Sequence, residues 1–467
     1  MRIPSQLHFV GIGGVGMSAV AAVWHERGGS VSGSDLHLSP ITKRLQAKGI
    51  SIYNGHHREN VQTLLEPAGQ ARGGIVVSTA VPIDNPEVAA AREQGIPIFH
   101  RSEILAALMA SGRSIAVTGT HGKTTTTGMV GTLLLEGGLD PTILIGGDLP
   151  LIGGNSRTGK GDLLVAESDE SDRSILRLTA EWVIVTKIEG DHLDHYRDVD
   201  DIIETLATWI NRLPRQTTVI ACLDDPGVQK LLGRIDRRYI TYGWNEAADH
   251  VIAAEQLSAN SSSFLLDDIP FEVRVPGRHN IANAAAAIVT AGLAGLEPLA
   301  IRAGLLKFGG VGRRFQVRGN VAGIQLIEDY AHHPSEIRAT LAAAKLIKRP
   351  VWVIFQPHRY SRTSALLDEF VHAFDEATAV AVMDIYSAGE VPNGISSRDL
   401  VERVHGANPN LKVYYWADHR TAEEGASRQL KSGDIVILMG AGNVNSLVEP
   451  LLECLRLREA AVSIPPA

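Results

Sequence analysis

Cysteine is scarce in this chain, which contains only Cys222 and Cys454 among its 467 residues. The two lie far apart and in no spacing typical of metal ligands. This argues against a disulfide framework and against a thiolate zinc site. We therefore expect both to be buried free thiols.

Long apolar runs and an excess of positive charge are also missing. No stretch approaches the ~18 uninterrupted apolar residues of a membrane span, and the amino terminus lacks the pattern of a signal peptide, so we expect a cytoplasmic protein. The net charge of −8 gives no general attraction to nucleic acid or to anionic lipid. An anionic substrate must therefore be held by local groups.

The length and the apolar pattern predict an α/β protein of two or three domains. Short β-branched runs, typical of buried parallel strands, alternate with alanine-rich stretches of helical length. The runs lie at 7–10, 75–77, 115–117, 163–165, 183–185, 324–327, 351–355, 379–383 and 435–439, and helical stretches at 18–25 and 280–293. Boundaries near residue 110 and at 309–314 divide the chain into domains 1–110, 111–311 and 312–467.

A glycine-rich loop follows the strand at 115–117 and precedes a helix. It contains Gly119, Gly122, Lys123 and Thr124. Such a loop offers backbone N–H groups to phosphate oxygens, the lysine reaches the terminal phosphates, and the threonine hydroxyl ligates magnesium. The standard nucleotide-binding motif has four residues between its glycines and this loop has two, but strand, glycines, lysine and threonine stand in the order that ATP binding requires.

Acidic residues follow two strands near this loop, where a magnesium ion needs oxygen ligands. One group is the acidic segment 167–172, which begins with Glu167. The other follows the strand at 183–185 and contains Glu189, Asp191, His192 and Asp194. Taken alone, either group is a common solvated turn. Together, at strand ends that face the ligand crevice of an open α/β sheet, they predict a metal site.

A second glycine loop, Gly11-Ile-Gly-Gly-Val-Gly16, follows the first strand, and Asp35 lies about twenty residues further on. This pattern matches the dinucleotide fingerprint of NAD-dependent dehydrogenases. The motif itself specifies only a pyrophosphate on a helix amino terminus and an acidic group near a ribose, so a UDP-sugar fits equally well. Ser78, Thr79, His100 and Arg101 are further candidates at later strand ends.

The last third of the chain repeats the arrangement of polar groups after strands. Residues 328–334 follow one strand, and residues 355–362 follow another. Arg359 and Arg362 form a pair that can grip a carboxylate bidentately. The histidines alone are ambiguous, because a lone histidine is often a satisfied structural residue.

With these residues in place, the chain resembles the Mur ligases over nearly its whole length. The resemblance rests on seven ordered motifs: 11–18, 118–127, 167–172, 191–194, 277–283, 329–334 and 355–363. It implies three domains: a Rossmann-like amino-terminal domain that binds UDP, a central P-loop ATPase-like domain with a parallel sheet, and a Rossmann-like carboxyl-terminal domain that admits the amino acid.

The resemblance also implies an activity. The members most similar to this chain use ATP and Mg²⁺ to activate the lactyl carboxylate of UDP-N-acetylmuramate and join it to L-alanine, in peptidoglycan precursor synthesis. The alternative within the family attaches a recycled murein tripeptide to the same nucleotide sugar, and a dehydrogenase remains the alternative outside it. Monomer and homodimer both stay open.

Carried over by position, the resemblance assigns roles to individual residues. Lys123, Glu167, His192 and Arg359 would be catalytic, and Thr124, Glu167 and His192 would hold the metal. ATP would contact Gly119, Thr120, His121, Gly122, Lys123, Thr124, Thr125, His279, Asn280, Asn283, Arg314, Asp329, Tyr330 and His332. The nucleotide sugar and the amino acid would contact Gly11, Gly13, Gly14, Gly16, Met17, Ser18, Asp35, Ser78, Thr79, His100, Arg101, His358, Arg359 and Arg362.

Two positions depart from the family pattern. Lys187 stands where relatives usually carry asparagine, which questions the polar network before Asp191. Asn443 stands where many members carry aspartate.

Overall fold

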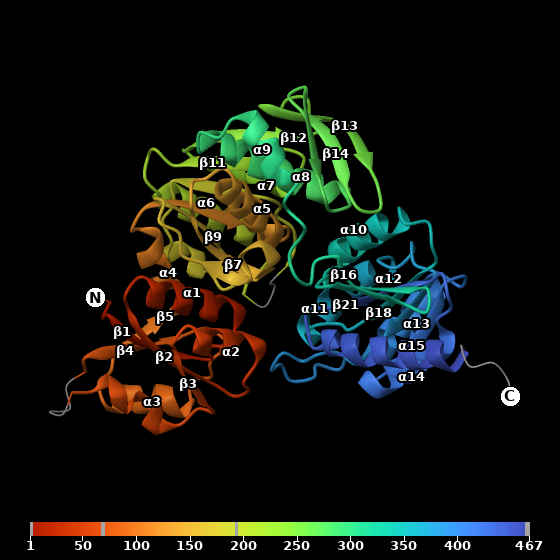
Figure 1. Cartoon of the computed structure of the whole chain (residues 1–467), viewed down its shortest axis with the longest axis horizontal. Coiled ribbons are helices and arrows are strands. Elements are labelled where there is room, and N and C mark those ends of the chain that lie inside the picture. Colours follow the sequence, from red (N-terminus) through yellow and green to blue (C-terminus); the bar gives the residue numbers. More distant parts are fainter. Residues whose placement is uncertain (1–2, 67–70, 192–194, 463–467) are drawn as a thin grey trace. The chain divides into compact units, whose positions relative to one another are not determined.

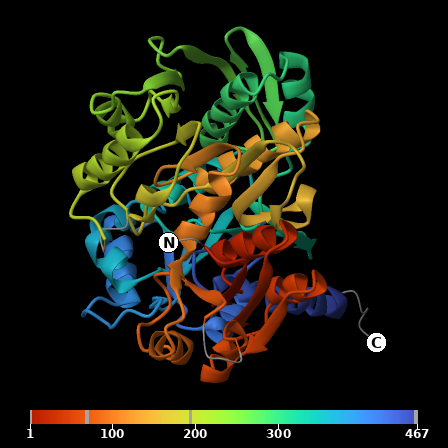
Figure 2. The ribbon, with the colours of Figure 1, turned by 90° about the vertical axis from the view of Figure 1, so that its left-hand side faces the viewer.

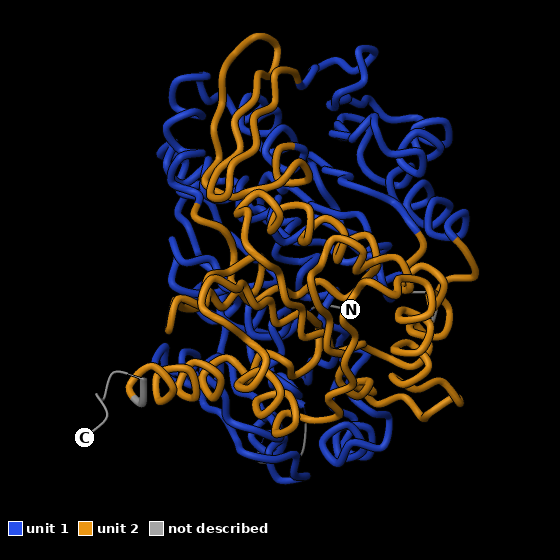
Figure 3. The backbone as a smooth tube through the Cα atoms, turned by 90° about the vertical axis from the view of Figure 1, so that its right-hand side faces the viewer, with its two compact units in different colours: residues 1–189, 199–252, 282–308 blue, residues 190–198, 253–281, 309–467 orange. Residues whose placement is uncertain are grey.

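The computed structural model describes residues 3–66, 71–191 and 195–462. The chain forms two compact units, coloured separately in Figure 3. Unit 1 contains residues 1–189, 199–252 and 282–308, and unit 2 contains residues 190–198, 253–281 and 309–467.

Unit 1 begins with a parallel sheet whose strand order is β3-β2-β1-β4-β5 (Figure 1). Helix α1 packs against α2 and α4, and these elements are the red and orange ribbons of Figure 2. The strands are β1 (Gln6–Val10), β2 (Ser30–Asp35), β3 (Ser51–Asn54), β4 (Gly73–Val77) and β5 (Ile98–His100). The helices are α1 (Val15–Glu26), α2 (Pro40–Ala47), α3 (Pro86–Glu93) and α4 (Arg101–Met109).

The second sheet of unit 1 has the strand order β12-β11-β10-β6-β9-β7-β8, and β13 joins β12 through the pair Tyr242–His250. The strands are β6 (Arg113–Thr118), β7 (Thr142–Leu149), β8 (Gly154–Arg157), β9 (Leu163–Glu167), β10 (Trp182–Val185), β11 (Thr218–Cys222), β12 (Arg238–Gly243) and β13 (His250–Leu257). The helices are α5 (Lys123–Glu136), α6 (Val199–Arg212), α7 (Pro226–Leu232), α8 (Arg278–Leu293) and α9 (Pro298–Leu305).

The register of this sheet places three strand ends at one edge. Glu167 pairs with Val117, and Val185 pairs with Thr118, so parallel strands β9, β6 and β10 finish side by side. The loops that follow them therefore leave the sheet at the same edge.

Unit 2 contains a sheet with the order β16-β17-β21-β18-β19-β20, parallel except for the β16–β17 pair, and an antiparallel hairpin β14–β15. The strands are β14 (Ser262–Leu266), β15 (Ile269–Val273), β16 (Gln316–Val321), β17 (Ile324–Asp329), β18 (Val351–Phe355), β19 (Ala379–Val382), β20 (Lys412–Tyr415) and β21 (Ile435–Met439). The helices are α10 (Pro334–Lys345), α11 (Tyr360–Ala365), α12 (Leu367–Val371), α13 (Ser397–Ala407), α14 (His419–Gln429) and α15 (Val448–Val462).

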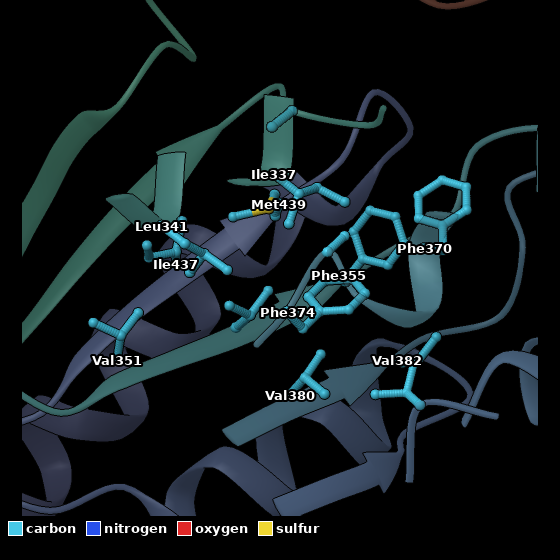
Figure 4. Packing of buried hydrophobic residues seen from close by; sticks show 14 of the residues in the cluster. Ile337, Leu341, Val351, Phe355, Phe370, Phe374, Val380, Val382, Ile437 and Met439 are labelled. Carbon is cyan, nitrogen blue, oxygen red and sulfur yellow. The ribbon is translucent and has the colours of Figure 1, made fainter. Parts of the chain in front are cut away.

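The core of unit 2 has an aromatic centre (Figure 4). The ring of Phe355 lies 5.6 Å from that of Phe370 and 5.2 Å from that of Phe374, in tilted pairs that stabilise beyond their buried area. Because Phe355 is the last residue of β18, this packing fixes the start of the segment that carries the arginine pair.

The structure confirms the predicted fold class, an α/β chain with parallel sheets in three sequential sets of strands. The β-branched runs form buried strands because both faces of a parallel sheet are covered. No helix among the described residues is long and apolar enough to cross a membrane. Both cysteines are free, but Cys454 is only partly buried, so the expectation of a buried thiol is wrong there; Cys222 is buried. The domain boundaries at 110 and 311 stay a prediction.

Candidate active site

The predicted phosphate loop lies between β6 and α5 in unit 1. Gly119 and Gly122 both have positive φ, +118° and +83°, in the region that favours glycine. A Cβ atom on Gly119 would lie 2.7 Å from the carbonyl oxygen of Lys187. That oxygen accepts a hydrogen bond from Thr120 N at 2.8 Å, and the Thr186 hydroxyl donates to Thr118 O at 3.0 Å. The segment after β10 thus holds the loop from one side, and only glycine fits at 119.

Lys123 is the first residue of α5, and its ammonium group turns back into the loop. It donates to Gly119 O at 2.7 Å and to the two carboxylate oxygens of Glu170 at 3.0 and 3.2 Å. Burial works to lower the pKa of Lys123, but Glu170 and Asp169 raise it above its ordinary value of 10.5. The lysine is therefore a fixed cation at the place where a phosphate would bind.

Glu170 was not singled out from the sequence as the partner of Lys123. Its side chain is fully buried, and it also accepts a hydrogen bond from the Thr118 hydroxyl at 3.3 Å. The signal was present, because Glu170 lies in the acidic segment 167–172. The sequence pattern predicted metal ligands in this segment. It could not show which of its acids would hold the metal and which would pair with Lys123.

Glu167 and Thr124 form the oxygen pair expected for magnesium. The Thr124 hydroxyl donates to Glu167 Oε1 at 3.0 Å, and Gly146 N donates to Oε2 at 2.7 Å. Burial raises the pKa of Glu167 above 4.5 although Lys123 opposes the shift. A hydroxyl and a carboxylate in contact beside a phosphate loop are the hard oxygen donors that Mg²⁺ prefers, so these residues fit the metal. His192 and Asp194 lie outside the described residues.

Three ionisable groups lie where the segment after β10 meets the loop. His121 Nε2 lies 2.7 Å from Glu189 Oε1, and the ammonium group of Lys187 lies 2.6 Å from Glu189 Oε2. Burial works to raise the pKa of Glu189, but His121 and Lys187 hold it well below 4.5. Lys187 thus has a local partner, and its backbone, not its side chain, supports the phosphate loop. The half-buried side chain of Thr125 and the buried side chain of Thr120 lie on the same loop and helix start.

The first glycine loop forms the turn from β1 into α1. Gly11 has φ +72°, and Gly14 precedes the helix without a side-chain cap, which leaves the first N–H groups of α1 for an anion. Asp35 accepts a hydrogen bond from Gly13 N at 2.8 Å. The carboxylate predicted to meet a ribose therefore also orders the loop. A Cβ atom on Gly16 would collide with the guanidinium of Arg101, which packs on this glycine.

The start of α1 is tied to the neighbouring sheet by Asn155, which sequence reasoning missed. Its amide group donates to Val15 O at 2.6 Å and to the Ser18 hydroxyl at 2.8 Å. Met17 and Ser18 are both buried. Both side chains thus anchor the helix. The Met17 backbone N–H lies in the first turn of α1 and can face a ligand.

The later strand ends of this sheet are more varied. His100 Nε2 lies 3.7 Å from Asp172 Oδ2, and burial lowers the pKa of His100. Ser78 is half-buried, whereas Thr79 is exposed. The assignment of both residues to the nucleotide sugar stays a prediction.

The residues predicted to border adenine divide between the two units. In unit 1, a Cβ atom on Gly122 would lie 2.6 Å from the buried Asn283 amide oxygen, which places Asn283 against the phosphate loop. In unit 2, the buried Asn280 donates to Pro276 O at 2.7 Å, and His279 is exposed.

Asp329, Tyr330 and His332 follow β17 in unit 2. Asp329 accepts hydrogen bonds from Phe315 N at 2.9 Å and Ala331 N at 2.7 Å, and burial raises its pKa to about 6. Arg314 lies over the ring of Tyr330 at 5.0 Å. Burial lowers the pKa of His332 to about 4, so this imidazole is neutral at pH 7.

The arginine pair follows β18, but its two members have different surroundings. Arg362 donates to Asp191 Oδ1 from Nε at 3.0 Å and from Nη2 at 2.7 Å. Arg359 Nη1 lies 3.9 Å from Glu390 Oε1, beyond hydrogen-bond distance. Burial, with His332 and Arg362 nearby, lowers the pKa of His358 to about 3. A neutral histidine and two guanidinium groups therefore share this loop.

The departure at Asn443 leaves the surrounding network intact. Its side-chain oxygen accepts a hydrogen bond from Gln356 Nε2 at 2.8 Å, and Gln356 Oε1 accepts one from Val444 N at 3.0 Å. An asparagine oxygen accepts here as an aspartate oxygen would.

Family models match three consecutive parts of the chain. The Mur ligase family catalytic domain matches residues 6–113, the Mur ligase middle domain matches residues 117–291, and the Mur ligase glutamate ligase domain matches residues 313–442.

Individual relatives match nearly the full length. The UDP-N-acetylmuramate–L-alanine ligase of Geotalea uraniireducens is 46% identical over 97% of this chain and 98% of its own. That of Solibacter usitatus is 45% identical over 97% and 96%. The crystal structure of UDP-N-acetylmuramate-alanine ligase from Thermotoga maritima superposes with a TM-score of 0.81 at 27% identity, covering 97% of this chain and 99% of that one. A murein peptide ligase from Psychrobacter arcticus shares the fold, with a TM-score of 0.73 at 22% identity over 99% and 100%.

Proposed function

The chain belongs to the Mur ligase family, and we propose that it joins L-alanine to the lactyl carboxylate of UDP-N-acetylmuramate with cleavage of ATP to ADP and phosphate. It is an ATP-dependent ligase of peptidoglycan precursor synthesis. Family membership decides against the NAD-dependent dehydrogenase suggested by the first glycine loop alone. A cytoplasmic location is part of the proposal, since both nucleotides are cytoplasmic metabolites.

The observation that carries the proposal is the phosphate loop with its fixed lysine. Lys123 is a permanent cation, and Thr124 and Glu167 lie in contact beside it. A transferred phosphoryl group needs positioning and charge neutralisation more than covalent chemistry, and these groups supply both. Mg²⁺, held by Thr124 and Glu167 with His192 assigned by resemblance, would neutralise phosphate charge.

The reaction passes through an acyl phosphate on the lactyl carboxylate. The L-alanine amine then attacks the acyl carbon, and phosphate leaves. Lys123 would offset the repulsion between an anionic carboxylate and an anionic nucleotide. Arg359 and Arg362 would hold a substrate carboxylate, because a guanidinium group presents paired donors to its two oxygens. His358 is neutral at pH 7 and would not add a further positive charge there.

Phosphate release tests the proposal directly. Purified protein receives ATP, Mg²⁺ and UDP-N-acetylmuramate with L-alanine, with murein tripeptide, or with no acceptor. We expect release that depends on L-alanine. Release that depends on the tripeptide would assign the recycling activity instead. Lys123→Ala should abolish release while UDP-N-acetylmuramate still binds, and near-normal release by this variant would contradict the assigned role of the loop.

A further inference from the structure

Arg359 has an unusual backbone conformation. Its φ is +71° and its ψ is 138°, a combination that residues with a Cβ atom rarely adopt. Conformations of this kind persist only where surrounding contacts hold them, and they concentrate at ligand-binding positions. The contacts that hold Arg359 therefore bear on where its guanidinium points.

The backbone of Arg359 is held by Tyr386, which lies in the segment after β19. Arg359 N donates to Tyr386 O at 2.8 Å, and Tyr386 N donates to Pro357 O at 2.9 Å. The ring of Tyr386 stacks on that of His358, with centroids 5.7 Å apart and planes 13° apart. Two backbone hydrogen bonds and one ring contact thus join the segments on either side of the arginine.

Glu390 holds the next turn of the chain. Its carboxylate accepts hydrogen bonds from Ser361 N at 3.0 Å and from the Ser361 hydroxyl at 2.6 Å. The same carboxylate lies 3.9 Å from Arg359 Nη1. It therefore fixes the first turn of α11 and lies beside the guanidinium.

Tyr386 is partly exposed but contacts its neighbours on two sides. A Cβ atom on Gly442 would lie 2.7 Å from Cγ of Tyr386 and 2.5 Å from Gln356 Oε1, so only glycine leaves room for the ring. The ring of Tyr386 therefore lies against Gly442 and is stacked on His358.

We propose that Tyr386 and Glu390 are positioning residues that hold Arg359 in its strained conformation and so aim its guanidinium at the carboxylate of the amino-acid substrate. This inference rests on the proposed function. Arg362 donates two hydrogen bonds to Asp191, whereas Arg359 lies beside the 386–390 segment. This segment therefore sets the orientation of Arg359 and not that of Arg362. A misdirected guanidinium loses the paired geometry that a carboxylate requires.

The test compares Glu390→Gln with wild type in the phosphate-release assay, with each substrate varied in turn. The amide keeps one acceptor for Ser361 but loses the negative charge. We expect the KM for L-alanine to rise about tenfold, the effect of losing ~1.4 kcal/mol of binding, while kcat and the KM values for ATP and UDP-N-acetylmuramate stay within about twofold. Glu369→Gln, an exposed acid on α12, is the matched control and should resemble wild type.

Each outcome decides one point. If wild type shows no release that depends on L-alanine, the proposed function fails, and the inference fails with it. If wild type is active but Glu390→Gln has an unchanged or lowered KM for L-alanine, the positioning role alone is overturned. If Glu390→Gln unfolds, Ser361→Ala removes only the hydroxyl donor, and an unchanged KM for L-alanine in that variant overturns the role.

Discussion

Replacement of Glu170 by glutamine gives the sharpest prediction about the phosphate loop. Glu170 is fully buried and pairs with Lys123 through two hydrogen bonds of 3.0 and 3.2 Å. It also accepts a hydrogen bond from the Thr118 hydroxyl at 3.3 Å. The glutamine side chain has nearly the same shape, so the variant changes the charge opposite the lysine and little else.

The expected cost follows from the burial of the pair. Removing one partner of a buried ion pair costs about 3–5 kcal/mol, because the remaining charge is left without compensation. The glutamine oxygen still accepts one hydrogen bond from Lys123, and Asp169 Oδ1 lies 3.7 Å from the ammonium group. We therefore expect the lower end, about 3 kcal/mol. ATP brings phosphate oxygens that replace the lost negative charge, so its stabilising effect should be larger in the variant than in wild type.

Urea unfolding with and without ATP and Mg²⁺ measures both effects. The relevant transition is the one that ATP shifts, because several domains do not unfold in a single step. Glu204→Gln is the matched control, since Glu204 is 66% exposed and pairs with Arg234 at the surface; its midpoint should stay close to wild type. A Glu170→Gln protein as stable as wild type without nucleotide would refute the reasoning, as would an equal ATP effect in both proteins.

Three further predictions concern other parts of the molecule. Gly119→Ala should raise the KM for ATP and should destabilise the protein more than Gly138→Ala does. Both glycines have positive φ, which costs an alanine about 1–2 kcal/mol, but only at 119 would a Cβ atom meet neighbouring atoms. Equal urea midpoints for the two variants would contradict the steric argument. Lys187→Asn should change the rate of phosphate release by no more than about fivefold, because the partly exposed ion pair of Lys187 with Glu189 is worth at most about 1 kcal/mol. A larger loss would show that the lysine side chain takes part in the reaction. Burial lowers the pKa of His332 from 6.5 to about 4. Between these pH values the unfolded chain binds a proton that the folded chain does not, so stability is lost as pH falls, by at most about 1.4 kcal/mol per pH unit. His332→Gln should flatten the pH dependence of the urea midpoint in this range, and an unchanged slope would contradict a neutral histidine in the folded protein.

Local features of the sequence were enough to predict the two glycine loops and nine of the strands, but not others such as β2, β7 and β11 to β15. The strand predicted at 351–355 is β18, and the helix predicted at 280–293 is contained in α8, which begins at Arg278. Such elements depend on short β-branched runs, on alternation with helices, and on glycines with positive φ. Neighbouring residues decide each of these, so the linear pattern carries the information.

The positions of Glu167 and Lys123 were also within reach of the sequence. Glu167 is the last residue of β9, and Lys123 begins the helix after the short loop that follows β6. Parallel strands place such ends at one edge of a sheet. The sequence could not decide which acid serves which partner. The structure pairs Glu167 with Thr124 and Glu170 with Lys123, because the register of β6 and β9 sets which side chain reaches which atom.

The first glycine loop and the arginine pair show the same division. The sequence predicted the loop, Asp35, Arg359 and Arg362 as separate features. Only the tertiary structure shows that Asp35 orders the loop through Gly13, and that Glu390 lies beside Arg359. These contacts join residues about twenty to thirty positions apart and depend on how strands pair and loops pack. The sequence thus determined which functional side chains this protein has, and the packing of its sheets and loops decided which of these side chains contact one another.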